Sequence, residues 1–214
     1  MTRPIPPHAG QPTIRTGASS DRTAAAMILI HGRGATAANI ITLAEQFEQP
    51  EFIYIAPQAK DDAWYPYSFR SNISDNEPGI SSAFSIIDSL IETLRAEGLP
   101  LDRIMLLGFS QGACLALEYA ARHAQKFGGV VGLSGALIGP DQTPRTYPGS
   151  LDGTPVFLGC SDVDPHIPEH RVEEASLVFR QLGGHVTRRF YHGLGHTVND
   201  DEIDFIQDMM TGLL

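Results

Sequence analysis

The sequence predicts an α/β fold, a three-layer sandwich in which helices cover both faces of a mostly parallel sheet of six or seven strands. Two observations lead to this prediction. Short apolar runs alternate along the chain with segments whose apolar residues recur with the period of a helix. Strands that are separated by helices pair in parallel through crossovers, and both faces of such a sheet are covered. The length of 214 residues suits one compact domain of this kind.

The expected strands are the apolar runs at residues 25–31, 52–56, 104–109, 130–133, 156–159 and 186–191. The expected helices are the segments at residues 37–47, 82–97, 111–123, 169–182 and 201–211. The helix at 82–97 has the clearest pattern, because its apolar residues lie near the 3.6-residue period and it stops at a Gly-Leu-Pro sequence. Acidic residues at 200–204 suit the first turn of the last helix, where the helix dipole favours negative charge.

The remaining segments predict an arm and two long loops. Residues 1–22 are rich in Pro, Thr, Ser and Gly without periodicity, so we expect a loosely ordered arm before a domain that spans residues 23–214. The connections at residues 57–81 and 135–153 are long, and loops of that length inside a compact domain tend to line sites. Both are too short to form a large cap domain.

The composition narrows the function classes. Lys and Arg number 15 against 25 Asp and Glu, a net charge of −10 without a basic cluster, which disfavours a nucleic-acid partner. The longest apolar runs are too short for a membrane span, and the N-terminus lacks the apolar stretch of a secretory signal. The two cysteines, Cys114 and Cys160, are expected to be reduced core residues. These features predict a cytoplasmic protein and leave a homodimer open.

The most informative motif is a Gly-x-Ser-x-Gly sequence at residues 108–112, which lies between an apolar strand and a helix-forming segment. This is the context of a nucleophile elbow. A one-residue turn from strand to helix forces Ser110 into a sparsely populated backbone conformation, and the chain passes too close to Gly108 and Gly112 for a Cβ. We expect Ser110 to be a nucleophile and the backbone N–H of Gln111 to face an oxyanion. The alternative is a tight structural turn.

A nucleophilic serine needs a base and a carboxylate that orients the base, and in such folds they follow in the order Ser, acid, His. Two acids and two histidines follow in that order, each just after a predicted strand. Of the acids, we favour Asp164, since the following proline fixes a turn, and assign Asp162 to capping the loop. Of the histidines, we favour His196, which lies in a Gly-Leu-Gly-His loop, whereas His192 is expected to pack or to bond to backbone.

A second oxyanion donor is expected in the loop after the first strand. That loop contains Gly32, Arg33 and Gly34, and its glycines permit a close backbone approach. The backbone N–H of Arg33 is the favoured donor.

Two other patterns are weaker. Residues 32–37 match a GxGxxA dinucleotide fingerprint, but the acidic residue that should follow the second strand is missing at 56–58. Residues 166–170 carry two histidines, but the sequence is not HExxH and Pro168 blocks a continuous helix between them. Nucleotide binding and a metal site are therefore disfavoured, and solvated or capping roles are expected for these histidines.

Four aromatic side chains lie in the first long loop, namely Trp64, Tyr65, Tyr67 and Phe69. Large rings on a loop can fasten it to the core. The alternative is that some of them form the wall of a substrate pocket. Both interpretations stay open for each of the four.

Four motifs in this order resemble the phospholipase/carboxylesterase family of α/β-hydrolases, which includes bacterial carboxylesterases and acyl-protein thioesterases. Along the chain the motifs are His31-Gly32, Gly-Phe-Ser110-Gln-Gly-Ala, Asp164-Pro-x-x-Pro168 and Gly195-His196, and the resemblance covers residues from about 24 to 214. It implies the α/β-hydrolase fold and a serine hydrolase that needs no metal or organic cofactor. It also implies Ser110 as nucleophile, Asp164 as acid, His196 as base, and Arg33 and Gln111 as oxyanion donors.

The chain departs from the thioesterases in two places. They usually have Leu-Gly-Asp after the early His-Gly, where this chain has Arg33-Gly34-Ala35, and the aromatic loop is more similar to small bacterial esterases of the family. We therefore expect a carboxylesterase that cleaves small-molecule esters through an acyl-enzyme on Ser110. The alternatives are an acyl-thioesterase or lysophospholipase on the same triad, and a non-catalytic binding protein on the same fold.

Overall fold

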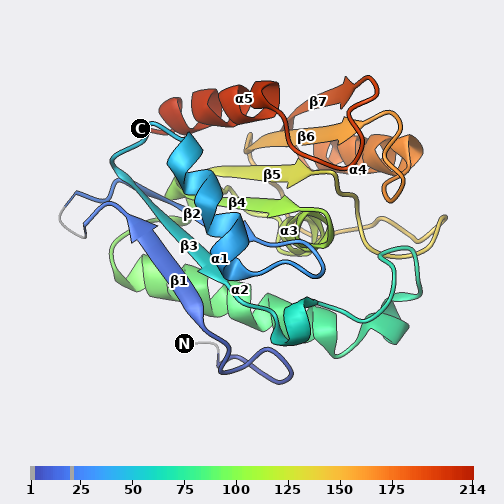
Figure 1. Ribbon diagram of the computed structural model, residues 1–214, viewed down its shortest axis with the longest axis horizontal. Helices are drawn as coiled ribbons and strands as arrows, with labels where there is room; N and C mark the ends of the chain where they lie inside the picture. Colours follow the sequence, from blue (N-terminus) through green and yellow to red (C-terminus); the bar gives the residue numbers. More distant parts are fainter. Residues whose placement is uncertain (1–2, 20–21) are drawn as a thin grey trace.

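A computed structural model describes residues 3–19 and 22–214. In this part of the chain, seven strands form one sheet in the order β1-β3-β2-β4-β5-β6-β7 (Figure 1). Neighbouring strands from β3 to β7 run parallel, and β1 is antiparallel to β3. The strands are β1 (Thr13–Gly17), β2 (Ala25–Ile30), β3 (Phe52–Pro57), β4 (Ile104–Phe109), β5 (Gly129–Leu133), β6 (Pro155–Ser161) and β7 (His185–Tyr191).

Helices cover both faces of this sheet, as the sequence predicts. The α-helices are α1 (Ala37–Ile40), α2 (Gly79–Ala96), α3 (Gln111–Arg122), α4 (Glu169–Gln181) and α5 (Asp200–Thr211). Successive strand residues face opposite ways, so Leu106 packs into the core under α2, α3 and α4, whereas Leu107 packs into the core under α1 and α5. The parallel sheet is thus buried on both sides, which explains why β2 is an uninterrupted apolar run.

Short 3₁₀ helices complete the secondary structure, at Ile41–Gln46, Lys60–Asp62, Ile73–Asn76 and Leu101–Arg103. The first of them divides the helix predicted at 37–47, because α1 ends after one turn and the chain tightens into the 3₁₀ helix. None of the helices in the described residues is long and apolar enough to cross a membrane.

The predicted N-terminal arm is more ordered than the sequence indicates. Residues Thr13–Gly17 form β1, which pairs with β3 at the edge of the sheet, and His8 is buried with its backbone N–H on the Ser82 hydroxyl. An edge strand whose side chains are mostly exposed has no apolar alternation to reveal it, since it is held by backbone hydrogen bonds. Residues 1–2 and 20–21 of the predicted arm lie outside the described residues.

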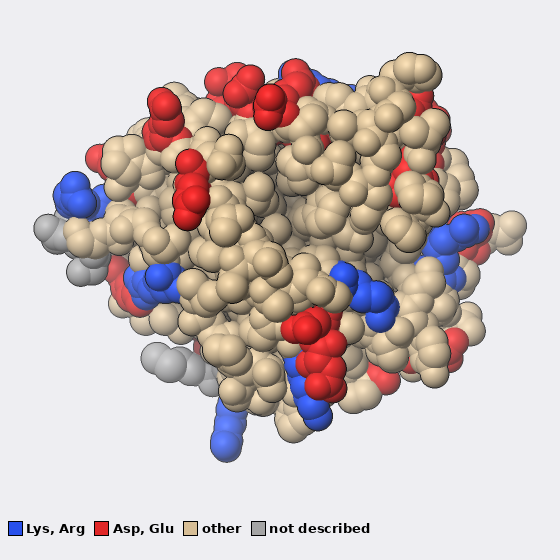
Figure 2. All heavy atoms as spheres, in the orientation of Figure 1, with Lys and Arg blue, Asp and Glu red and all other residues tan. Residues whose placement is uncertain are grey.

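Charge is unevenly spread over the face seen in Figure 2. Acidic side chains gather where α5 lies, and the basic side chains are scattered. Four exposed aspartates of α5 contribute to this, namely Asp200, Asp201, Asp204 and Asp208. A phosphate backbone would be repelled from this side of the molecule.

The two long connections lie at the carboxyl ends of the strands, and the described residues contain no large cap domain. The segment at 58–78, between β3 and α2, carries two of the short 3₁₀ helices. The segment at 134–154 supports it, because the N–H of Gly139 donates to the carbonyl of Phe69. The segment at 58–78 therefore reaches the site described below, and the segment at 134–154 packs against the segment at 58–78.

Candidate active site

Ser110 lies at the turn between β4 and α3, in a backbone conformation that few residues adopt. Its φ of 55° and ψ of −118° fall outside the regions that L-residues favour. A Cβ on Gly108 would overlap the backbone of Gly112, and a Cβ on Gly112 would overlap the carbonyls of Ile30 and His31. The two glycines therefore let the chain turn sharply and leave the Ser110 hydroxyl above the end of the sheet.

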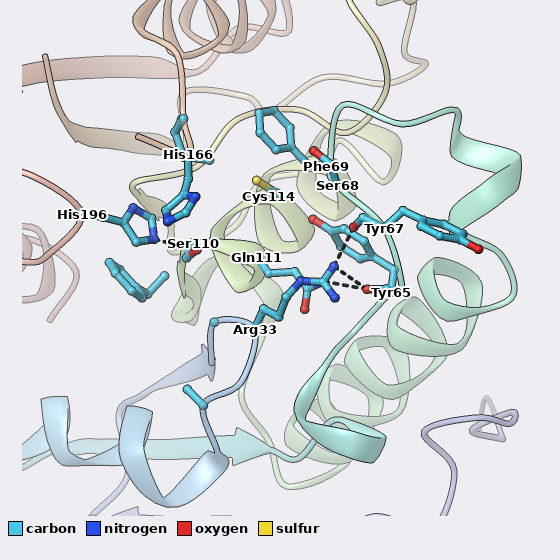
Figure 3. Close-up of a pocket in the computed structure, with 14 residues that line it drawn as sticks. Arg33, Tyr65, Tyr67, Ser68, Phe69, Ser110, Gln111, Cys114, His166 and His196 are labelled. Carbon is cyan, nitrogen blue, oxygen red and sulfur yellow. Dashed lines mark hydrogen bonds between the residues drawn. The ribbon is translucent and has the colours of Figure 1, made fainter. Parts of the chain in front are cut away.

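His196 joins Ser110 to Asp164 (Figure 3). Its Nε2 atom lies 2.9 Å from the Ser110 hydroxyl oxygen, and its Nδ1 atom lies 2.7 Å from Oδ2 of Asp164. A neutral imidazole with its proton on Nδ1 donates to the carboxylate and accepts from the hydroxyl. The structure thus brings together three residues that stand far apart in the sequence.

Asp164 is held as a buried carboxylate. Its side chain is 0% exposed, and its second oxygen accepts the backbone N–H groups of His166 at 2.8 Å and Ile167 at 3.0 Å. Burial raises the pKa of Asp164, but the hydrogen bonds from His196 and from these two N–H groups outweigh it and set the pKa below its usual value. The carboxylate therefore stays ionised beside His196.

The other acid and histidine form a separate pair at the surface. Oδ2 of Asp162 lies 2.6 Å from Nδ1 of His192, and its Oδ1 accepts the N–H of Gly193 at 2.9 Å. Asp162 caps the loop as expected. The expectation for His192 is wrong, because its ring is 97% exposed and contacts a carboxylate rather than backbone or core.

The loop after β2 passes directly beside Ser110. A Cβ on Gly32 would lie 3.3 Å from the Cβ of Ser110, so the next backbone N–H, that of Arg33, is brought close to the turn. Within the described residues, the N–H groups of Arg33 and Gln111 have no backbone or side-chain acceptor. Gln111 is the first residue of α3, where a helix leaves its N–H groups free. Two backbone donors without an acceptor therefore lie on the two segments that meet at Ser110.

A pocket of about 500 Å³ opens in front of Ser110. It is lined by Gly32, Arg33, Ala35, Tyr65, Tyr67, Ser68, Phe69, Phe109, Ser110, Gln111, Cys114, His166, Ile167 and His196. Three of the four aromatic residues singled out in the sequence are among them, and Tyr67 is the exposed one. A volume of this size and the mixture of apolar walls with a few polar groups are typical of small-molecule sites.

Trp64 does not line this pocket, and of the two interpretations left open for it the structure favours the one in which the ring fastens the loop. Its ring is buried between His8 and His31, with ring centroids 5.2 Å and 5.0 Å away, and its indole N–H donates to the His31 carbonyl at 2.9 Å. The indole thus fastens the loop to the loop after β2.

The side chain of Arg33 clamps the aromatic loop, which the sequence analysis missed. Its guanidinium donates to the carbonyls of Tyr65 at 2.7 Å and Tyr67 at 2.6 Å (Figure 3), and to that of Pro66 at 3.0 Å. The side chain of Gln111 binds the same loop, since it accepts the N–H of Trp64 and donates to the carbonyl of Tyr65, both at 2.8 Å. No sequence signal reveals these contacts, because they depend on how residues 58–78 fold back.

The sequence analysis also missed His166 as a pocket residue. Its ring meets the His196 ring edge-on at 4.8 Å, and it lines the pocket rather than only the solvent. The tight turn of Asp164-Pro-His166 was the available signal, because the turn that aims the carboxylate carries the next histidine with it. Cys114 is buried as expected, although its thiol also lines the pocket. Among the described residues, no His, Cys, Asp or Glu side chains gather in threes as metal ligands would.

A doubly covered parallel sheet with a serine at this turn is the α/β-hydrolase fold, as the sequence predicts. The chain belongs to the phospholipase/carboxylesterase family of hydrolases, because that family's model matches residues 12–213. A solved phospholipase/carboxylesterase from Dyadobacter fermentans is 36% identical, with a TM-score of 0.91 over 97% of this chain and 99% of that one. Acyl-protein thioesterase 1 of Neurospora crassa is 27% identical over 89% of this chain and 87% of its own length. The same enzyme of Eremothecium gossypii is 29% identical over 91% of this chain and 92% of its own length.

Proposed function

We propose that this protein is a serine carboxylesterase that cleaves small esters through an acyl-enzyme on Ser110. The observation that carries the proposal is the hydrogen-bonded arrangement in which His196 lies within 2.9 Å of the Ser110 hydroxyl and within 2.7 Å of the Asp164 carboxylate. This arrangement meets the requirement of nucleophilic catalysis, a nucleophile in contact with a base that a third group orients.

The first half-reaction forms the acyl-enzyme. His196 takes the proton of Ser110 as its oxygen attacks the ester carbonyl, and the ionised Asp164 stabilises the imidazolium. The N–H groups of Arg33 and Gln111 bind the oxyanion. The imidazolium then gives the proton to the departing alcohol, and the C–O bond of the ester breaks.

The second half-reaction hydrolyses the acyl-enzyme and regenerates the free enzyme. His196 removes a proton from water, the hydroxide attacks the acyl-enzyme, and the carboxylic acid leaves as Ser110 regains its proton. Side chains and backbone groups supply every step of this sequence, so it calls for no metal or organic cofactor.

Short and medium acyl chains are the expected substrates, because the long loops add no large cap that would bury a long chain. The alternative substrate is a thioester, which the similarity to acyl-protein thioesterases favours. Turnover of matched esters and thioesters from acetyl to palmitoyl separates the two. A rate that climbs steadily to palmitoyl would contradict the preference for short chains.

The test of the mechanism is S110A. This variant is expected to fold like the wild type and to lose both turnover of p-nitrophenyl butyrate and labelling by a fluorophosphonate probe. Wild-type turnover in S110A would remove Ser110 from the mechanism. Failure of the wild type to hydrolyse any ester, with no labelling by the probe, would favour the non-catalytic alternative.

The cellular compartment and the partners of the protein are part of the same proposal. We place it in the cytoplasm, because Cys114 and Cys160 are both free thiols, and reducing compartments keep thiols in this state. A small-molecule ester is the partner that the pocket accommodates. Sedimentation analysis will test whether the chain forms a homodimer.

A further inference from the structure

Tyr65 presents a buried hydroxyl that the chemistry above does not use. The residue is 2% exposed and lines the pocket, yet its hydroxyl has no hydrogen-bond partner among the described residues. The thiol of Cys114 lies beside it, and a thiol is a weak acceptor. A buried polar group without a partner is costly, whereas phenylalanine would fill the same space without that cost. Because Tyr65 also lines the pocket, its hydroxyl points to a partner that arrives with the substrate.

The position of Tyr65 identifies which part of the substrate it meets. In Figure 3, His196 and His166 lie on one side of Ser110, and Tyr65, Phe69 and Cys114 lie on the other. The leaving alcohol must lie against His196, because that imidazole protonates it. The acyl group then extends to the opposite side, toward Tyr65.

The distance along α3 indicates how far the Tyr65 hydroxyl lies from the reacting serine. Cys114 is one helical turn beyond Ser110, and its N–H donates to the Ser110 carbonyl at 3.0 Å. One turn of helix is about 5.4 Å. A substrate atom that reaches the Tyr65 hydroxyl, beside Cys114, must therefore lie several bonds along the acyl chain from the ester carbonyl. A short acyl chain is long enough for this.

The chemistry of the surroundings defines the ligand group. Phe69 and Ile167 give the pocket apolar walls. Burial raises the pKa of Tyr65 well above its usual value, so the hydroxyl keeps its proton and donates at neutral pH. A donor among apolar walls selects an acceptor oxygen on an otherwise apolar chain.

We propose that Tyr65 is a specificity-determining residue, and that the preferred acyl groups carry an oxygen acceptor (a carbonyl, ether or hydroxyl) that takes a hydrogen bond from its hydroxyl. This inference rests on the proposed ester hydrolysis, since it concerns the acyl group of that reaction.

The test compares p-nitrophenyl esters of equal chain length, in which one methylene is replaced by an oxygen or a ketone at successive positions. The kcat/KM of wild type and Y65F is measured for each pair. At the best position, Y65F is expected to lose about 3- to 10-fold more activity on the oxygen-bearing ester than on its alkyl match, as for one hydrogen bond. The ratio between the two enzymes cancels the intrinsic reactivity of each ester.

A matched control is Y54F. Tyr54 in β3 also has a buried hydroxyl without a partner, but it packs in the core under α1 and does not line the pocket. Y54F is expected to keep the wild-type activities on both members of each pair. Equal losses in Y65F on both members, at every position, would overturn the inference.

A second measurement needs no variant. The wild-type kcat/KM, divided by the hydroxide-catalysed rate of the same ester, should peak for one position of the oxygen. A flat profile would overturn the role of Tyr65 while leaving ester hydrolysis intact. Absence of turnover on every ester would instead contradict the proposed function itself.

Discussion

Asp162 and Asp164 differ by two positions in one loop, yet each contacts a different histidine. Asp164 is fully buried and receives two backbone N–H groups besides His196. Asp162 pairs with an exposed ring, where solvent weakens the interaction. At the scale of the residue, burial and the position of the partner decide which carboxylate can orient a base next to Ser110.

This contrast predicts unequal effects of the same substitution. D164N should lower kcat by about 10³- to 10⁴-fold, because the amide no longer holds the imidazole in the tautomer that accepts the serine proton. D162N is the matched control, and it should keep kcat within about 3-fold of wild type because its pair is exposed. Steady-state turnover of p-nitrophenyl butyrate measures both. A larger loss in D162N than in D164N would reverse the assignment.

The turn from β4 to α3 depends on backbone contacts that no side chain can relieve. G112A should lower the free energy of unfolding by about 3 kcal/mol or more, because its Cβ would overlap two carbonyls of the loop after β2. Activity should fall with it. G212A is the control, since Gly212 has helical dihedral angles and an added Cβ meets its neighbours at 3.5 Å or more. Urea unfolding of both variants gives the comparison, and equal stabilities would contradict the tight contact.

The Arg33 clamp predicts an effect on substrate binding. R33A removes three hydrogen bonds to the wall of the pocket but keeps the backbone N–H, so KM should rise by about 10-fold with a smaller change in kcat. R33K should recover part of the loss. R70A removes a neighbouring arginine whose ion pair with Asp141 is exposed and 3.5 Å long, and KM should stay unchanged. A fall of kcat alone in R33A would contradict this role.

Stability of the whole molecule should depend on pH through Glu202. Its carboxyl is buried against β6, where a Cβ on Gly159 would overlap it, and one of its oxygens has no partner in the described residues. Burial raises the pKa of Glu202 to about 7, against the opposing hydrogen bond from Asn199 and together with the charge of Asp201. The folded state therefore holds a proton that the unfolded chain releases at lower pH.

The sign follows from this difference in proton binding. Because the pKa of Glu202 is about 7 in the folded state against 4.5 ordinarily, its contribution to stability should be fully present below about pH 4.5 and be lost as the pH rises through about 7, by up to about 3 kcal/mol. E202Q should flatten this part of the profile and keep the cap of α5, because its amide oxygen can still accept the Asn199 N–H. Urea unfolding of both proteins from pH 4.5 to 8 measures the difference. Parallel profiles would exclude Glu202 as the cause.

The fold as a whole was predictable wherever side chains carry a pattern. Buried strands such as β2 and β4 are apolar throughout, and the Gly-x-Ser-x-Gly turn has few backbone solutions, so sequence locates Ser110 closely. The order of acid and histidine then restricts the partners to four residues, and the structure brings Asp164 and His196 to Ser110. At these strands and at this turn, the local sequence alone was sufficient to predict the structure.

The sequence did not predict those parts of the structure that are fixed by backbone hydrogen bonds or by contacts between residues far apart in the chain. The edge strand β1 has mostly exposed side chains and is held by its ladder with β3. The burial of Trp64 depends on His8, which lies 56 positions away, and the clamp of Arg33 spans a comparable separation of 32 to 34 positions. Loop-to-loop contacts of this kind leave no periodicity in the sequence.

Arg33 links two properties that enzyme engineers usually vary separately. Its main chain follows Gly32, which lies next to the serine, and its guanidinium holds the carbonyls of the opposite wall. Any remodelling of residues 65–67 that pulls on this side chain will also disturb the peptide group from which it projects. Directed evolution of a broader substrate range should therefore leave residues 65–67 unchanged and vary pocket side chains outside the clamped carbonyls, such as Phe69.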